Sequence, residues 1–148
     1  MSELTAAQQH AWRALVIATH RLDEALDRQS RRDGGVPHAY YKLLVFLYES
    51  ADRRLAMSQL AAQLGYSPSR LAHAVASLER SGWVRRVRST EDRRVQFAEL
   101  TAEGAGIVRA VTPGQVAEVR EPVLKALSAA DVAALERIAT ALTRALEA

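Results

Sequence analysis

An arginine-rich stretch at residues 85–95, RRVRSTEDRRV, contains the side chains of this chain best suited to hold a ligand. Five arginines flank an acidic pair, Glu91 and Asp92. The guanidinium group is a planar fork of N–H donors that can form two hydrogen bonds at once with a phosphate or with a guanine edge. The stretch is therefore either a solvated surface loop or a contact surface for a polyanion, and its composition alone does not separate the two.

The positive charge of the chain is concentrated around this stretch. The 148 residues carry a net charge of +3, whereas residues 67–94 alone hold seven arginines and three acids, a local charge of +4. The remaining 13 basic and 14 acidic residues give a net charge of −1. A basic segment in an otherwise neutral chain indicates a polyanionic partner such as nucleic acid.

Other kinds of chemistry have little support in the sequence. Cysteine is absent, which excludes disulfides, thiol catalysis and a cysteine-ligated zinc site. The four histidines lack the HxxxH and HExxH spacings of zinc sites, and no P-loop, GxGxxG or GxSxG stretch occurs. Glu91 and Asp92 lie beside arginines, which suits no acid–base role. We therefore expect no enzyme activity, no metal and no cofactor.

Length and composition indicate one domain-sized globular chain. Hydrophobic residues make up 49% of the 148 residues and charged residues 25%, which is ordinary for a soluble protein. The sequence contains no apolar run long enough to span a membrane, and its N-terminus lacks the pattern of a secretion signal. The expected compartment is the cytoplasm.

Two short helices are predicted immediately before the arginine-rich stretch. Ser58 is expected to cap the first, over residues 59–64, and Gly65 is expected to end it. Ser67 is expected to cap the second, over residues 68–80, with a proline at its first position. Two short helices joined by a glycine-containing turn form a helix-turn-helix.

A β-hairpin is predicted to follow. Residues 83–88 and 95–100 are rich in β-branched and aromatic residues, and a polar stretch separates them. Thr101 then caps another helix. A helix-turn-helix followed by a hairpin is a winged helix, in which a recognition helix enters the major groove of DNA and the hairpin, or wing, reaches the adjacent backbone or minor groove.

The recognition helix presents a polar stripe opposite its apolar one. Leu71, Val75 and Leu78 recur at the spacing of a buried face. The side chains that remain available to DNA can all form hydrogen bonds; they are Ser67, Ser69, Arg70, His73 and Ser77. The alternative is that this stripe is the solvated face of a helix in a packed bundle.

Longer amphipathic helices flank the winged helix. The first is predicted over residues 6–30, and a second over residues 37–50 leads through an extended connection, residues 51–57, into the helix-turn-helix. Pro113–Gly114 should kink or break the helix that begins at Thr101, and Pro122 is a second point of stress.

The last helix is predicted to begin at a capping box formed by Ser128 and Asp131. One stripe of this helix is apolar; its members are Val132, Leu135, Ile138, Ala139, Leu142 and Leu146.

Residues 60–104 resemble the core of the MarR family, the multiple-antibiotic-resistance regulators. Three motifs in family order carry the resemblance: LERSG at residues 78–82, DRR at residues 92–94 and LTAEG at residues 100–104. The long first helix and residues 112–135 extend it over nearly the whole chain. The recognition helix departs from the pattern, because Ala72 and His73 stand where many members have Thr and Arg.

The resemblance implies a mainly α-helical fold with a small β-hairpin wing, and a homodimer. Residues 1–35 and 105–148 would form a helical dimerisation region, and residues 36–104 a winged helix-turn-helix that binds double-stranded DNA. The alternative to dimerisation is that the terminal helices pack on each other within one chain. The implied function is transcriptional regulation, usually repression, at a pseudo-palindromic operator.

The resemblance also implies roles for individual residues. In the wing, Arg94 would enter the minor groove, Asp92 would orient it, and Arg86 and Arg93 would contact DNA nearby. A small aromatic or anionic effector would bind between the dimerisation helices and the winged helix. Candidate lining residues are Trp12, Arg13, His20, His38 and Tyr41, although Trp12 and Tyr41 are better explained as core or interface residues.

Two other functions remain open at this stage. One is an architectural protein that binds DNA with little regard to sequence. The other is a sensor or interaction module that has lost DNA binding.

Overall fold

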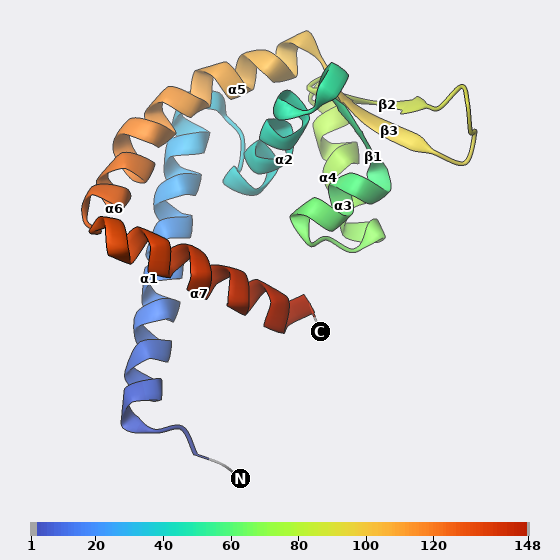
Figure 1. Cartoon of the computed structure of the whole chain (residues 1–148). Coiled ribbons are helices and arrows are strands. Elements are labelled where there is room, and N and C mark those ends of the chain that lie inside the picture. Colours follow the sequence, from blue (N-terminus) through green and yellow to red (C-terminus); the bar gives the residue numbers. More distant parts are fainter. Residues whose placement is uncertain (1–2, 148) are drawn as a thin grey trace.

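The computed structural model describes residues 3–147, so the outermost residues of the predicted terminal segments lie outside it. A helical frame carries a winged-helix unit on one side (Figure 1). In chain order the elements are α1 (Ala6–Gly34), α2 (His38–Glu49), η1 (Ala51–Arg53), β1 (Arg54–Ala56), α3 (Met57–Leu64), α4 (Pro68–Arg80), β2 (Val84–Arg88), β3 (Gln96–Leu100), α5 (Ala102–Gln115), η2 (Val116–Arg120), α6 (Glu121–Lys125) and α7 (Ala129–Glu147).

The helix-turn-helix forms at the predicted place, with one error in its capping. Gly65 has a φ of 69°, the left-handed conformation that ends α3. The Ser67 hydroxyl accepts the Arg70 backbone N–H at 3.2 Å and caps α4, as predicted. Ser58 is not an N-cap. The helix α3 already begins at Met57, and the Gln59 side chain accepts the Ala56 N–H at 3.2 Å.

The wing belongs to a three-stranded antiparallel sheet in the order β1–β3–β2. The hairpin of β2 and β3 was predicted, but residues 51–57 also contain the strand β1, which pairs with β3 from Arg54 opposite Glu99 to Ala56 opposite Phe97. A strand of three residues is too short for an alternating pattern to appear in the sequence. It covers the edge of β3 and so stiffens the base of the wing.

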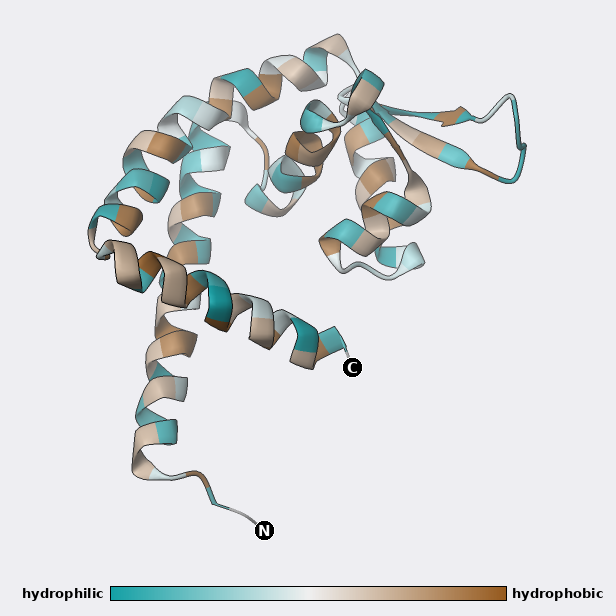
Figure 2. Ribbon diagram, viewed as in Figure 1, coloured by the Kyte–Doolittle hydropathy of each residue, from teal (hydrophilic) through white to brown (hydrophobic). Residues whose placement is uncertain are grey.

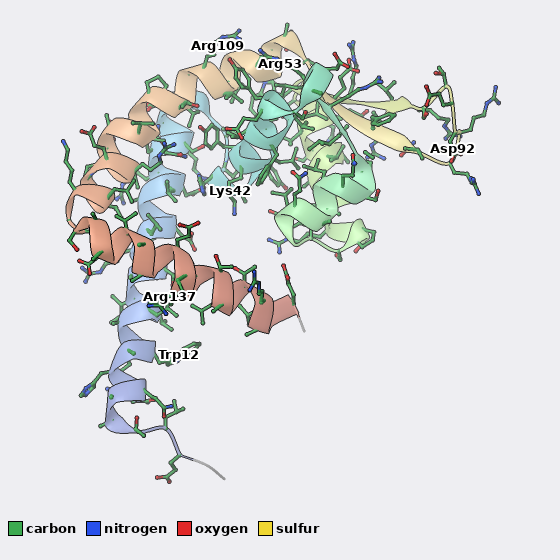
Figure 3. The ribbon with its side chains drawn as sticks, viewed as in Figure 1. Trp12, Lys42, Arg53, Asp92, Arg109 and Arg137 are labelled. Atoms are coloured by element: carbon green, nitrogen blue, oxygen red, sulfur yellow. The ribbon has the colours of Figure 1, made fainter. Side chains whose placement is uncertain are left out.

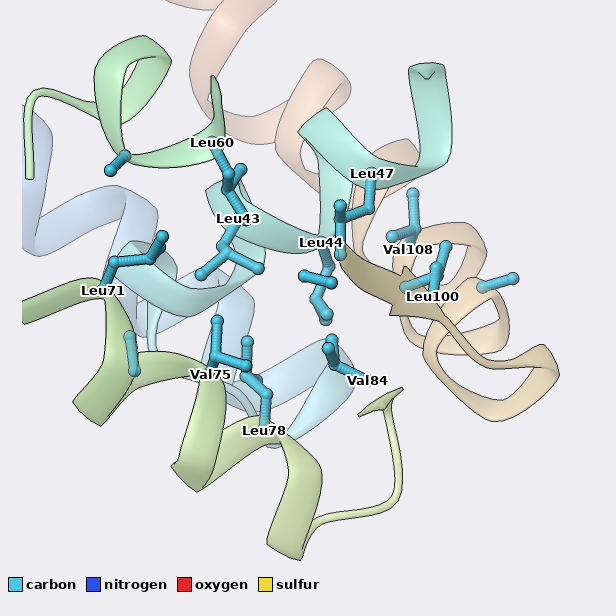
Figure 4. Packing of buried hydrophobic residues seen from close by; sticks show 14 residues of the cluster. Leu43, Leu44, Leu47, Leu60, Leu71, Val75, Leu78, Val84, Leu100 and Val108 are labelled. Atoms are coloured by element: carbon cyan, nitrogen blue, oxygen red, sulfur yellow. The ribbon is translucent and has the colours of Figure 1, made fainter. Parts of the chain in front are cut away.

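A single apolar cluster holds the winged helix together (Figure 4). Leu44 and Leu47 of α2 pack in it with Leu71 and Leu78 of α4 and with Val84 at the start of β2, all of them buried. Because α4 and β2 share this core, the recognition helix and the wing are held as one body. Val108 of α5 packs in the same cluster, so the winged helix is also joined to the helical frame.

The helix α1 is longer than predicted. It continues through Arg31 to Gly34, and Gly35, with a φ of 64°, ends it by donating its N–H to the Arg31 carbonyl at 3.0 Å. The predicted end at Ser30 was wrong because the charged residues 31–33, which precede the two glycines, remain helical. Only the second glycine adopts the left-handed conformation.

The predicted break at Pro113–Gly114 does not occur. Residues through Gln115 stay helical, and five residues of π-helix, η2, link α5 to α6 along the curved path in Figure 1. A proline removes one N–H from a helix, and a change of hydrogen-bond register accommodates that loss. The buried Gln29 side chain of α1 also donates to the Val111 carbonyl at 2.9 Å, just before the π-segment.

Glycines permit the close approach of α1 and α5. A Cβ atom at Gly34 would lie 2.4 Å from the Val111 side chain, and one at Gly114 would lie 2.2 Å from the Asp33 carboxylate. An ion pair between Arg32 and Glu118, at 2.6 Å, ties the same region of α1 to η2. The two helices α1 and α5 of the frame are therefore held together by a tight crossing.

The frame leaves apolar faces open. Figure 2 shows hydrophobic residues along α1 and α7, and the side chains of Trp12 and Ile138 remain 57% and 48% exposed. The terminal helices therefore do not bury these faces within one chain. The exposed set also includes Leu15, Val16, Ile17, Leu22, Val123, Leu124, Val132, Leu135, Leu142 and Leu146. No helix within residues 3–147 combines the length and the hydrophobicity that a membrane crossing requires.

Candidate nucleic-acid interface

The polar stripe predicted on α4 faces solvent. Leu71, Ala74, Val75 and Leu78 are buried, which leaves Ser69, Arg70 and His73 exposed on the other side. Ser77 is half-buried further along. The first two turns of α4, with the capping Ser67, therefore offer two hydroxyls, a guanidinium and an imidazole to an approaching ligand at the positive end of the helix dipole.

The tip of the wing is an ordered turn. The Ser89 hydroxyl accepts the backbone N–H groups of Glu91 and Asp92, both at 3.2 Å, and the Ser89 N–H donates to the Val95 carbonyl at 2.9 Å. Ser89 was not singled out from the sequence. A serine two or three residues before an acidic pair is the pattern of a side-chain-to-backbone turn, so the signal was present.

Asp92 braces Arg94 at this tip, where Figure 3 labels Asp92. The Asp92 carboxylate accepts the Arg94 backbone N–H at 3.0 Å and its side-chain Nε–H at 3.2 Å. The Arg94 backbone and then its guanidinium hold the pKa of Asp92 below the usual value of 3.8. The Arg94 side chain is nevertheless 92% exposed, so its orientation is guided while its remaining donors stay free.

The other arginines of the stretch are not equivalent. Arg85 is paired with Glu99 on the neighbouring strand, with its Nε 3.0 Å from the carboxylate. Arg86 lies 3.6 Å from the carboxylate of Glu79, which also accepts the Arg86 backbone N–H at 3.3 Å. Glu79 thus fastens the base of the wing to α4. Arg93 is exposed at the tip.

The backbone geometry explains why glycine ends the motifs LERSG, at Gly82, and LTAEG, at Gly104. Gly82 has a φ of 80°, which favours glycine at the turn between α4 and the wing. The Thr101 hydroxyl donates to the Gly82 carbonyl at 2.7 Å and accepts the Gly104 N–H at 3.0 Å. A Cβ atom at Gly104 would lie 2.2 Å from the Trp83 carbonyl oxygen. The start of α5 is therefore clamped against the root of the wing.

The five candidate effector residues do not come together. His38 and Tyr41 line a cavity of about 590 Å³ between α1, α2, the α5–α6 run and α7. Trp12 instead lines a smaller hollow of about 390 Å³ with Ile138 and Leu142. Arg13 and His20 are exposed on α1, and His20 lies 3.4 Å from Glu24.

The larger cavity is mostly apolar, with a few polar groups. The Tyr41 hydroxyl is hydrogen-bonded to Thr112 at 2.7 Å. The His38 Nδ1 and the Gln115 Nε2 are both buried without a hydrogen-bond partner among residues 3–147. Burial, followed by the charge of Lys42, lowers the pKa of His38 from its ordinary 6.5. Gln115 was not predicted as a site residue, because a glutamine on a helix carries no sequence signal for binding.

Comparison with known proteins identifies the family. The model of the MarR family matches residues 34–95. The structure of Sco3205, a MarR family transcriptional regulator from Streptomyces coelicolor in complex with DNA, is 44% identical over 99% of this chain and 92% of that chain, with a TM-score of 0.94. The chain belongs to the MarR family. AbsC, a MarR family transcriptional regulator of the same organism, is 33% identical over 99% of both chains, with a TM-score of 0.92.

Curated relatives match a shorter part of the chain. PrsX of Escherichia coli, an HTH-type transcriptional regulator, is 29% identical over 87 residues, which are 59% of this chain and 52% of PrsX. YetL of Bacillus subtilis, an HTH-type transcriptional repressor, is 29% identical over 57% of this chain and 51% of its own length. The match thus spans about half of each curated relative, whereas the MarR family structures align over nearly the whole chain.

Proposed function

We propose that this chain is a homodimeric transcriptional regulator, in the first instance a repressor, that binds a pseudo-palindromic operator in double-stranded DNA. Residues 36–104 form the DNA-binding unit, and residues 1–35 and 105–148 form the dimerisation region. The observation that carries the proposal is that α4 and the wing are fixed on one core and both present free basic side chains.

Each part has a role that its geometry supports. The N-terminal turn of α4, with Ser67, Ser69, Arg70 and His73, enters the major groove, where each base pair shows a distinct pattern of donors and acceptors. Ser77 lies further along the same stripe. In the wing, Arg94 enters the minor groove while Arg93 and Arg86 contact the backbone.

The relatives support DNA binding and repression. Sco3205, whose fold and sequence are similar over nearly the whole chain, was determined in complex with DNA. YetL is named a transcriptional repressor. The exposed apolar faces of α1 and α7 support a dimer, whose two-fold axis would place two α4 helices in successive major grooves about 34–36 Å apart.

The test compares two arginines of the wing. Arg94→Ala is expected to weaken binding to an operator by about 1–3 kcal/mol. Arg85→Ala removes the same charge from the same hairpin, but Arg85 is paired with Glu99 on the neighbouring strand, so a smaller loss is expected. Gel-shift titrations with the DNA that lies beside the gene of this protein, at fixed salt, measure both variants.

The same titrations separate the alternatives. A regulator should prefer its operator over unrelated DNA by about 10³-fold or more. Equal affinity for all duplexes would indicate an architectural protein. A wild-type protein that binds no duplex would indicate a sensor or interaction module.

We further propose that the cavity lined by His38 and Tyr41 holds a small aromatic or anionic effector. Its largely apolar wall suits a ring, and the unpartnered nitrogens of His38 and Gln115 suit polar substituents. An effector that prefers a state with misplaced α4 helices lowers DNA affinity by its differential affinity for the two states. A thermal-stability screen against phenolic acids and antibiotics tests this, with Gln115→Leu as the variant expected to lose the response.

A further inference from the structure

A tyrosine in the turn of the helix-turn-helix contacts the recognition helix. The Arg70 guanidinium carbon lies over the Tyr66 ring, 4.1 Å from its centre, which is a cation–π contact. Tyr66 was not singled out from the sequence, where it appeared only as part of the turn. Arg70 is one of the side chains proposed to contact bases.

The ring is held firmly enough to serve as a support. The Tyr66 backbone N–H donates to the Ala61 carbonyl at 2.9 Å, directly after the left-handed Gly65. The half-buried ring packs against the apolar core that joins α4 to the wing. The Ser67 hydroxyl holds the Arg70 backbone N–H. Both ends of the Arg70 residue are thus fixed by neighbouring turn residues.

The stack leaves the useful part of the guanidinium free. The ring contacts one side of the group, and the guanidinium has five N–H donors, so donors remain that can bind the O6 and N7 atoms of guanine. No acidic side chain in the part of the chain that the structure describes forms an ion pair with Arg70, in contrast to Arg85, Arg86 and Arg94. An arginine that is oriented but not neutralised is suited to read a base pair.

We infer that Tyr66 is a positioning residue that holds the Arg70 guanidinium in the orientation in which it reads a base pair, and so contributes to operator sequence preference. The inference rests on the proposed DNA binding. Two other arginines stack on aromatic rings, Arg53 on Tyr48 at 4.0 Å and Arg54 on Phe97 at 4.6 Å, but neither lies on α4. The exposed Arg54 therefore provides a matched control.

The experiment is a double-mutant cycle on the DNA sequence that the wild-type full-length protein enriches from a random duplex library. Arg70→Ala is expected to weaken binding to that sequence by about 5- to 150-fold, the range for one specific base contact. Tyr66→Leu is expected to weaken it by about 2- to 5-fold in the wild-type background, the range for an exposed cation–π contact. In the Arg70→Ala background it should have an effect of less than about 1.5-fold.

Two further readouts separate positioning from a general effect on the fold. Tyr66→Leu and Arg70→Ala should relax the preference at the same base-pair position of the enriched sequence. Tyr66→Phe, which keeps the ring, should retain wild-type affinity and preference. Thermal unfolding of each variant verifies that it is folded before its titration.

The control uses the stack outside α4. Arg54→Ala removes the same charge as Arg70→Ala. In the Arg54→Ala background, Tyr66→Leu should weaken DNA binding by the same factor as in the wild-type protein. Equal losses from Tyr66→Leu with and without Arg70 would overturn the inference, as would a gain in affinity, which would mean that the ring withholds Arg70 from DNA. A wild-type protein that enriches no sequence would instead overturn the proposed function on which it rests.

Discussion

At the scale of single residues, the carboxylate of Asp92 has two tasks in the wing. It accepts the backbone N–H of Arg94, which shapes the turn, and the side-chain Nε–H, which aims the guanidinium. The carboxylate also brings a negative charge to a surface that is proposed to meet phosphates. For Asp92 to favour DNA binding, the gain from orienting Arg94 must exceed the repulsion between the carboxylate and the phosphates.

Asp92→Asn is expected to weaken DNA binding by about 0.5–1.5 kcal/mol, the scale of one hydrogen bond, because an amide accepts from Arg94 without the charge. Glu91→Gln removes the same charge from the preceding residue, which is exposed and does not brace Arg94. It should leave affinity unchanged or raise it slightly. Fluorescence anisotropy with labelled operator measures both, and a parallel gain in the two variants would contradict the brace.

A second residue-scale prediction concerns His38 and pH. Its pKa is lowered by burial, so the folded state prefers the neutral imidazole. The stabilising effect is complete above the ordinary pKa of 6.5 and is lost as the pH falls from there toward the folded pKa. The free energy of unfolding should therefore fall between pH 7 and pH 5, and fall less in His38→Gln. Urea unfolding at both pH values measures this change. The same change in the free energy of unfolding for the wild-type protein and for His38→Gln would count against this account.

At the scale of elements, the root of the wing depends on the start of α5. The methyl group that Gly104→Ala adds would meet the Trp83 carbonyl oxygen, so we expect a loss of about 1–3 kcal/mol in the free energy of unfolding. Gly106, two residues further along the same helix, has open space around it, and Gly106→Ala should stabilise the protein by about 0.5–1 kcal/mol. Denaturant titration of both variants checks the difference in sign.

Much of the element order was predictable, because it depends on local chemistry. Three predicted helix caps are present: Gly65 ends α3, Ser67 caps α4, and Ser128 and Asp131 form a capping box. In that box, the backbone N–H of each residue donates to the side chain of the other. The strand β1 was missed because its formation depends on β3, which is distant in sequence. The π-segment was missed because the sequence shows where a proline interrupts the hydrogen bonds of a helix but not how the helix accommodates the loss.

The candidate interface was also predictable in part. The brace between Asp92 and Arg94 followed from a family resemblance, and its contact is present in the structure. The support of Arg70 by Tyr66 depends on how a turn places a ring, which residue type does not indicate. The effector residues were least predictable, since Trp12 lies near the start of the long helix α1 and lines a different hollow from His38, which begins α2.

At the scale of the whole molecule, the open faces of α1 and α7 predict how a charge would affect association. Ile138→Glu places a charge in the apolar stripe of α7 and should shift the protein from dimer to monomer, because a buried unpaired carboxylate is costly. Thr140→Glu adds the same charge to the same helix outside that stripe and should leave the dimer intact. Sedimentation measurements give the mass of each variant; a wild-type monomer at micromolar concentration would contradict the assignment of this face.

In the proposed dimer, the open stripes would make the abundance of the protein part of its stability. A second copy would cover side chains such as Trp12 and Ile138, which would couple folding to association by mass action. The midpoint of thermal unfolding would then rise with protein concentration. A cell that makes few copies would hold a less stable protein, whose unfolded chains are open to proteolysis, so copy number would set both the occupancy of an operator and the lifetime of the chain.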